Sequence, residues 1–187
     1  MFATELPGGI KGTGATHTFV VVKTSDGNIQ RYEYGPDGNS LLDAFSGKSN
    51  LTQCFYQDSE KSVSTYMSTG KMDANTKNVE VVNIPNGMTS DQFDDAIIKS
   101  ASDFKDNQEI KYRIIPIDAT EGNCNTSTTS LLKNAGVPQN EINRIGKNIN
   151  GIKTGFGIMK PWTKKQRETA LKEKVKMSES LSNHIGL

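Results

Sequence analysis

The chain has 187 residues, of which 34% are apolar, and its 22 basic and 21 acidic residues leave a formal net charge of +1. This length accommodates one domain with a sizeable core and is marginal for two, and the near-neutral charge gives no support to nucleic-acid binding through a broad basic face. No stretch approaches the roughly 18 consecutive apolar residues of a membrane-spanning helix, so we expect no transmembrane segment.

Two further features of the composition bear on where and how the protein works. The first residues, MFATELPGGIKGTG, lack both the basic start and the apolar core of a cleavable signal peptide, so export would need another route. The two cysteines, Cys54 and Cys124, are able to form one disulfide. Neither CxxC nor HExxH occurs and the histidines are His17 and His184 alone, so we expect no metal site and no cofactor.

The first predicted elements form a β-hairpin. Residues 16–24, THTFVVVKT, are rich in β-branched and aromatic side chains, and the strand-like IQRYEYGP follows after Asp26-Gly27. Asp-Gly between two strands favours a two-residue type I′ turn, which needs positive φ at both positions. In that register Phe19 faces Tyr34, and Tyr34 lies diagonal to His17 on the same face of the sheet.

The middle of the chain is predicted to combine short elements with one long helix. Residues 37–77 carry no sustained hydrophobic period. The expected elements are, in chain order, a short helix at 41–45, a short strand at 54–56, a strand at 79–85, a helix at 87–104 and a strand at 109–117. Thr89 or Ser90 caps the long helix, and its apolar face carries Phe93, Ile97, Ala101 and Phe104.

A helix that begins near Cys124 dominates the last third of the chain. It is expected to end at Gly136, a position suited to the left-handed conformation, with Pro138 just beyond. Its first half consists of threonine and serine, which are weak helix formers, so tertiary packing against a sheet must hold it. A second helix at 138–149 and a mixed-charge helix at 160–181 follow. We expect the basic face of the last helix to be solvated, with docking to an anionic surface as the alternative.

Cys124 is the candidate nucleophile. A helix N-terminus lowers the pKa of a cysteine, because unpaired N–H groups and the helix dipole favour negative charge there, and the same N–H groups are able to receive an oxyanion. Such a thiol also needs a base, and His17 at the head of a strand is the candidate. The simpler alternative is a buried cysteine that acts as a small hydrophobic side chain.

Several motifs together resemble a known enzyme family. GATHTFVVV, a hairpin to YEYGP, a strand-helix-strand spacer and GNCNTSTTSLLKNAGVP occur in this order between residues 8 and 138. This order resembles the circularly permuted NlpC/P60 group of papain-like Cys-His hydrolases, in which the histidine strand precedes the cysteine helix. The HTFVVV and NCNT runs also look like cysteine hydrolase toxins delivered between bacteria, such as type VI secretion effectors.

The resemblance implies a fold and a set of site residues. The fold would be α+β and papain-like, with an antiparallel sheet packed against the cysteine helix, a catalytic domain at 1–150 and a C-terminal helical extension at 151–187 on the same domain. Cys124 matches the nucleophile and His17 the general base. For the third group, which orients the imidazole, we favour Tyr34. A turn slipped by one residue would bring Glu33 to that face instead, and a bare dyad is the remaining alternative.

The resemblance also implies a function, namely an antibacterial secreted effector that cleaves amide bonds in peptidoglycan peptides. It would be exported without a standard signal peptide and act in the periplasm of the target cell, with a secretion-apparatus carrier and a cognate immunity protein as further partners. Lipid acyl hydrolysis or acyl transfer on the same fold is the alternative. A non-catalytic binding module, with a vestigial or disulfide-bonded cysteine, is the second alternative.

The other candidate residues receive structural interpretations. Cys54 is expected in or near the core, and His184 in a solvated tail. Residues 7–14, PGGIKGTG, lack the GK[ST] ending of a phosphate loop and suit a flexible lip beside His17. Asn123 and Asn125 flank the cysteine, where either would cap the helix or donate to an oxyanion, and capping is favoured.

Overall fold

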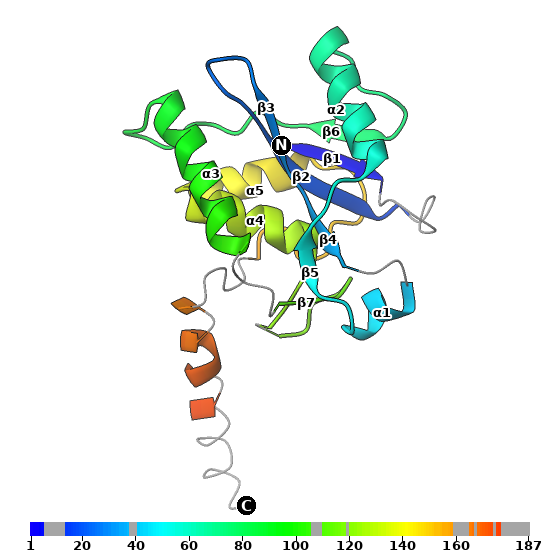
Figure 1. The fold of residues 1–187 in the computed structure, drawn as a ribbon, viewed down its shortest axis with the longest axis vertical. Helices are drawn as coiled ribbons and strands as arrows, with labels where there is room; N and C mark the ends of the chain where they lie inside the picture. Colours follow the sequence, from blue (N-terminus) through cyan, green and yellow to red (C-terminus); the bar gives the residue numbers. More distant parts are fainter. Residues whose placement is uncertain are drawn as a thin grey trace, which may run out of the picture.

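The computed structural model describes residues 1–5, 14–37, 41–105, 110–118, 120–158, 165–166, 168–173 and 175–176 (Figure 1). The strands are β1 (Phe2–Glu5), β2 (Thr16–Lys23), β3 (Ile29–Tyr32), β4 (Tyr34–Pro36), β5 (Leu51–Gln53), β6 (Thr76–Val79), β7 (Lys111–Tyr112) and β8 (Glu121–Gly122). The helices are α1 (Leu41–Ser46), α2 (Gln57–Thr69), α3 (Ser90–Lys105), α4 (Cys124–Asn134) and α5 (Gln139–Asn148).

The fold is α+β and is built on an antiparallel sheet, as the sequence predicts. Four strands pair in the order β3-β2-β1-β6, while β4 pairs with β5 and the short β7 pairs in parallel with β8. In Figure 1, α3, α4 and α5 gather on one side of β2 and α2 lies on the other. Val20 and Val22 of β2 join the main core, whereas Phe19 joins a smaller cluster with Phe2 and with Val63 of α2. The sheet is therefore covered on both faces.

The hairpin register differs by one residue from the predicted one. Val20, rather than Val21, lies opposite Tyr32. The turn has three residues, because Gly27 N donates to Thr24 O at 2.9 Å and Thr24 N donates to Asn28 O at 3.0 Å. Gly27 has a φ of 86°, and no described residue other than glycine has a positive φ. A type I′ turn would need positive φ at the aspartate as well, so the chain forms a type I turn with a glycine bulge instead.

Helix α4 packs against β2 as expected, although its buried surface is polar. All of residues 124–132 are buried. Thr128 Oγ1 donates to Thr18 O at 2.9 Å, and Thr18 Oγ1 donates to Asn125 Oδ1 at 2.9 Å. These bonds satisfy the buried hydroxyls, which explains why weak helix formers are stable here. The helix ends as predicted, with Gly136 at a φ of 94°.

Helices α3 and α5 complete the core. The predicted apolar face of α3 is confirmed, since Phe93, Ile97, Ala101 and Phe104 are all buried. Thr89 is the cap, because Gln92 N donates to its Oγ1 at 3.2 Å. The predicted helix at 138–149 is confirmed as α5, which buries Ile142 and Ile145.

Two predicted strands do not form as expected. The strand predicted at 79–85 is wrong, because β6 shares only Val79 with it and residues 80–85 form no strand. Of the strand predicted at 109–117, only β7 forms. After Tyr112 the backbone finds partners in two different segments, as Arg113 N donates to Gly122 O and Ile114 N donates to Ala44 O. The chain therefore leaves the ladder at this point.

Some elements lie outside the sequence predictions, and some predictions lie outside the described residues. No pattern predicts β1 or α2. The short helix at 41–45 is confirmed as α1, whereas the strand expected at 54–56 is wrong, since β5 ends at Gln53 and residues 54–56 form no strand. Residues 6–13, His184 and part of the predicted helix at 160–181 are not among the described residues. In the described part of the chain, no helix has the length and apolar character needed to cross a bilayer.

Candidate active site

Cys124 is the first residue of α4, where the cap fixes the start of the helix. Thr126 N donates to Asn123 Oδ1 at 2.9 Å, and Asn123 N donates to Thr126 Oγ1 at 2.8 Å, which together form a capping box. The expected capping role of Asn123 is confirmed. The N–H groups of Cys124 and Asn125 have no acceptor within the helix, since they belong to its first turn.

His17 of β2 and Cys124 meet although 107 positions separate them in the chain. Their side chains are close enough for Cys124 to raise the pKa of the imidazole, through its charge and a side-chain hydrogen bond. Asn125 holds the two elements together on either side of this contact, because its Nδ2 donates to Thr16 O at 3.2 Å and its Oδ1 accepts from Thr18 at 2.9 Å. Asn125 is therefore a structural bridge between helix and strand.

The group that orients the imidazole is Glu33, and the preference for Tyr34 is wrong. His17 Nε2 lies 2.7 Å from Glu33 Oε1, and the carboxylate is fully buried. Tyr34 instead packs its ring edge-on against Phe104, with centroids 4.7 Å apart. The physical reason is the three-residue turn, because a slip of one residue reverses which side chains face each side of the sheet.

Glu33 is itself fixed by three further donors. Ser59 Oγ of α2 donates to Oε1 at 2.5 Å, Tyr56 N donates to Oε2 at 3.2 Å, and Arg31 Nε lies 3.2 Å from Oε2. A buried carboxylate with this many partners keeps its position. Since Nε2 of His17 is engaged by Glu33, Nδ1 is the ring nitrogen that remains for Cys124.

The surroundings of His17 favour its protonated form. Burial alone lowers the pKa of the imidazole, but the charge on Cys124, the hydrogen bonds to Cys124 and Glu33, and the Glu33 charge raise that pKa from 6.5 to about 10. At neutral pH the ring is therefore an imidazolium. A protonated imidazole beside a cysteine at a helix N-terminus is the environment in which cysteine side chains act as nucleophiles.

Two tyrosines complete the site, and neither is predicted from the sequence. The Tyr112 side chain of β7 forms a hydrogen bond with Cys124, and burial, followed by the charge on Cys124, raises the pKa of its phenol well above the ordinary value. The Tyr56 ring lies edge-on to His17, with centroids 5.4 Å apart. Tyr112 lies on a two-residue strand and Tyr56 follows a three-residue one, so no periodic pattern marks them.

Cys124 is 2% exposed, so an acyl group reaches the sulfur only when neighbouring side chains move.

The second cysteine has a different environment. Cys54 and Cys124 are both free, so the disulfide alternative does not apply to this structure. Cys54 is half-buried and hydrogen-bonds to Tyr56, and burial, followed by the Glu33 charge, raises the pKa of its thiol. A thiol with a raised pKa is a poor nucleophile. Among the described residues, no three His, Cys, Asp or Glu side chains are grouped as metal ligands would be.

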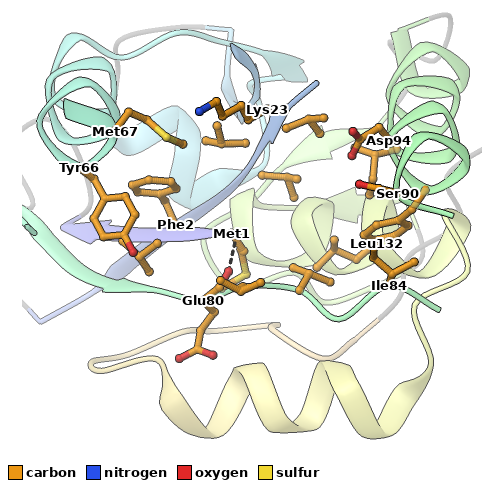
Figure 2. Close-up of a pocket in the computed structure, with 18 residues that line it drawn as sticks. Met1, Phe2, Lys23, Tyr66, Met67, Glu80, Ile84, Ser90, Asp94 and Leu132 are labelled. Atoms are coloured by element: carbon orange, nitrogen blue, oxygen red, sulfur yellow. Dashed lines mark hydrogen bonds between the residues drawn. The ribbon is translucent and has the colours of Figure 1, made fainter. Parts of the chain in front are cut away.

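An apolar hollow beside the sheet lies away from the thiol. A cavity of about 350 Å³ opens at the far end of β2, between α2 and α3 (Figure 2). Figure 2 shows Met1, Phe2, Tyr66, Met67 and Leu132 around it. Neither Cys124 nor His17 lines this cavity. Cys124 and His17 lie at the opposite end of β2, where α4 begins.

Comparisons with known proteins add no relative to this picture. The chain matches no protein-family model, no curated protein sequence and no solved structure. The functional argument therefore rests on the geometry around Cys124, His17 and Glu33.

Proposed function

We propose that the protein is a cysteine hydrolase that cleaves an acyl bond through a thioester intermediate. The observation that carries the proposal is one continuous chain of side chains, in which the Cys124 thiol at a helix N-terminus bonds to His17 and His17 bonds to Glu33. This arrangement supplies a nucleophile, an acid-base group and an orienting carboxylate, which are the three roles of a catalytic triad. The α+β fold, with the cysteine helix against an antiparallel sheet, agrees with the papain-like, permuted NlpC/P60 topology that the motifs suggest.

The reaction proceeds in two steps. The Cys124 thiolate attacks the carbonyl carbon, the bond from that carbon to the leaving nitrogen or oxygen breaks, and His17 gives its proton to the leaving group. Water then attacks the thioester carbon and passes a proton to His17, and the thiolate leaves as the carboxylic acid forms. Glu33 keeps Nε2 engaged throughout, so the same ring nitrogen faces the sulfur in both steps.

The first turn of α4 supports an oxyanion site. The N–H groups of Cys124 and Asn125 have no acceptor within the helix, and the helix dipole favours negative charge at this end. The Tyr112 hydroxyl, which bonds to the Cys124 side chain, is a further donor beside the sulfur. Donors placed before the reaction starts lower the barrier by stabilising the charge that develops on oxygen.

The motif resemblance provides the first substrate to test. It suggests an amide bond in peptidoglycan peptides, cleaved by an antibacterial effector in the periplasm of a target cell, with a secretion carrier and an immunity protein as partners. Acyl bonds of lipids are the second substrate class, because the same thiolate and oxyanion donors act on an ester. The buried contacts at the thiol serve both reactions equally.

The proposal is tested by reactivity and by turnover. Iodoacetamide near neutral pH should alkylate Cys124 faster than Cys54, as measured by peptide mass spectrometry, because only Cys124 has an imidazolium partner. The protein should also release new amines from muropeptides or fatty acids from phospholipids, and Cys124→Ala should abolish that release. Equal alkylation of the two cysteines together with no turnover of either substrate would contradict a cysteine hydrolase.

A further inference from the structure

One edge of the sheet is open. Strand β3 is the last strand on its side of the sheet, and among the described residues it pairs with β2 alone. Thr24 N donates to Asn28 O at 3.0 Å, so these two residues form a hydrogen-bonded pair. Bonded and non-bonded pairs alternate along an antiparallel ladder, so the backbone N–H and C=O groups of Ile29 and Arg31 point away from β2. These donors and acceptors form a template for one more strand.

The side chains of β3 reach two different hollows, one on each face of the sheet. Figure 1 shows the β2–β3 hairpin with α2 on one side and α3 on the other. Ile29 and Arg31 line a groove of about 680 Å³ against α2, and Gln30 lines a hollow of about 340 Å³ against α3. A strand added beside β3 would alternate in the same way, because successive side chains of a strand point to opposite faces.

The groove against α2 is mainly apolar, and we call it the apolar groove. Its apolar lining residues are Ile29 (47% exposed), Phe55 (65%), Met67 (38%) and the buried Val63. The Arg31 guanidinium lies over the Phe55 ring, 5.4 Å from its centroid, while Arg31 Nε lies 3.2 Å from Glu33 Oε2. Glu60 also lines the groove, so it carries charges of both signs. The groove therefore suits aliphatic or aromatic side chains rather than residues of one charge.

The hollow against α3 is acidic, and we call it the acidic hollow. None of the described residues that line it is basic, and four of them are aspartates, namely Asp26, Asp91, Asp94 and Asp95. Burial, followed by the charges of Asp91 and Asp95, raises the pKa of Asp94. Like charges that are crowded in this way favour a cation beside them.

We propose that β3 is a docking edge for an extended segment of a partner protein in which aliphatic and basic residues alternate. The backbone of this segment would bond to Ile29 and Arg31. Its aliphatic side chains would enter the apolar groove, and its lysines or arginines would lie beside the aspartates of the acidic hollow. Because β3 has only four residues, the side chains on both faces must supply much of the binding free energy.

Charge selects such a partner over a second copy of this chain. Antiparallel pairing of β3 with β3 of a second copy would place both acidic hollows on the same face of the joined sheet. Like charges brought together in this way repel one another, whereas the basic residues of a partner neutralise the aspartates.

Peptide binding tests the docking edge separately from the proposed chemistry. Cys124→Ala protein is used, so that no peptide bond is cleaved. The probe is a fluorescent peptide of about eight residues in which valine and lysine alternate, and its binding is measured by fluorescence anisotropy. We expect saturable binding that weakens in high salt, and binding about tenfold weaker or more when glutamate replaces lysine.

Methylated peptides test whether the backbone of the probe takes part. The amide nitrogens of an added strand face β3 at every second residue only. Methylation of one alternate set of nitrogens should therefore weaken binding about tenfold or more, and methylation of the other set less than about threefold. Equal effects of the two sets would contradict an added strand.

Protein variants test the two sides of the edge. Asp94→Asn combined with Asp95→Asn should weaken binding of the valine–lysine peptide about threefold or more. The matched control is Glu168→Gln combined with Glu173→Gln, which removes the same charge from exposed residues of the C-terminal segment, far from the hairpin in Figure 1, and should change binding less than about twofold. Ile29→Pro removes one outward N–H and one side chain of the apolar groove, and should weaken binding about tenfold.

The outcomes decide the proposal. No saturable binding of the valine–lysine peptide, equal binding of the valine–glutamate peptide, or an equal loss in the two double variants would overturn the docking edge. Self-association that Ile29→Pro abolishes, without peptide binding, would assign the edge to a second copy and overturn the proposed partner. None of these measurements uses the Cys124 thiol, so their failure would leave the cysteine hydrolase in place.

Discussion

Glu33 shows how much of the site depends on a single residue. Its carboxylate is fully buried, bonds to His17 and accepts from Ser59 and from the Tyr56 backbone. It also contributes to the raised pKa of His17. Glutamine has the same shape as glutamate and would retain some of these contacts without the charge. A glutamine at position 33 therefore tests the effect of the charge separately from that of packing.

Glu33→Gln should therefore weaken the chemistry while the protein remains folded. Without the carboxylate charge the pKa of His17 falls, so the imidazolium that stabilises the thiolate is lost at a lower pH than in the native protein. We expect hydrolysis to fall roughly 10²–10⁴-fold, with a loss of activity on the alkaline side that begins at lower pH. The measurements are the pH dependence of hydrolysis and of Cys124 alkylation by iodoacetamide.

Tyr34→Phe is the matched control for Glu33→Gln. It keeps the ring that packs on Phe104 and removes the hydroxyl of the residue that the two-residue turn would have placed near His17. Hydrolysis should change less than about threefold, since Glu33 rather than Tyr34 orients the imidazole. A large loss in this variant with little effect of Glu33→Gln would reverse the assignment.

At the scale of elements, β4 and β5 must come very close to the loop that carries Tyr56. A Cβ built on Gly35 would overlap the Tyr56 hydroxyl and approach Cys54 Sγ to 3.0 Å. Tyr56 in turn lies against His17. The short β4–β5 pair therefore positions the loop that covers His17.

Gly35→Ala should destabilise the protein and disturb the site together. We expect a loss of about 1–3 kcal/mol in the free energy of unfolding, measured by chemical denaturation, because the added methyl displaces the Tyr56 side chain. Combining it with Tyr56→Phe removes the overlapping oxygen and should recover most of that loss, which a pair of independent sites would not do. If the double variant shows simple additivity, the close approach is not the cause.

The elements also show what the sequence is able to predict. Helix α3 has a regular apolar face and a cap at Thr89, and both are visible in the sequence. Helix α2 is different, because two of its three buried residues are serines, Ser59 and Ser62, which bond to Glu33 and to Asp73. A helix that buries hydroxyls against charged partners leaves no hydrophobic period, so its existence depends on contacts that are distant in the chain.

The site likewise contains residues that the sequence predicts and residues that it does not. Cys124 and His17 are predicted from a helix start, a strand start and the order of motifs, and the structure brings the two side chains together. Whether Glu33 or Tyr34 orients the imidazole depends on whether the turn has two residues or three. The Asp-Gly pair alone does not decide this, because glycine supplies a positive φ in both kinds of turn. Tyr112 was not recognisable, because it lies on a two-residue strand whose partner β8 comes nine positions later in the chain.

At the scale of the whole molecule, Glu141 and Arg144 of α5 bond to Glu80 and Asn83, which follow β6, and together we call these four residues the polar clamp. The clamp does not belong to the hydrogen-bond network around Cys124. Glu141 accepts from Asn83 N at 2.9 Å and from Arg144 Nε at 2.8 Å, and Arg144 also bonds to Glu80 at 2.9 Å. The Arg144 hydrogen bond, opposed by burial and helped by Asn83, lowers the pKa of Glu141 from 4.5 to about 2. The clamp therefore makes the free energy of unfolding depend on pH through residues outside the candidate site.

Acid should release this clamp over a defined range. The unfolded chain binds more protons than the folded one between about pH 2 and 4.5, so the stabilisation by Glu141 is complete above pH 4.5 and is lost as the pH falls towards 2. In Glu141→Gln the free energy of unfolding should be lower by about 2 kcal/mol at pH 7 and should fall less steeply below pH 4.5. Alkylation of Cys124 at neutral pH should stay at the native rate, because none of the side chains that contact the thiol belongs to the clamp. A variant with unchanged acid sensitivity, or one in which Cys124 alkylation changes together with stability, would contradict the separation between clamp and site.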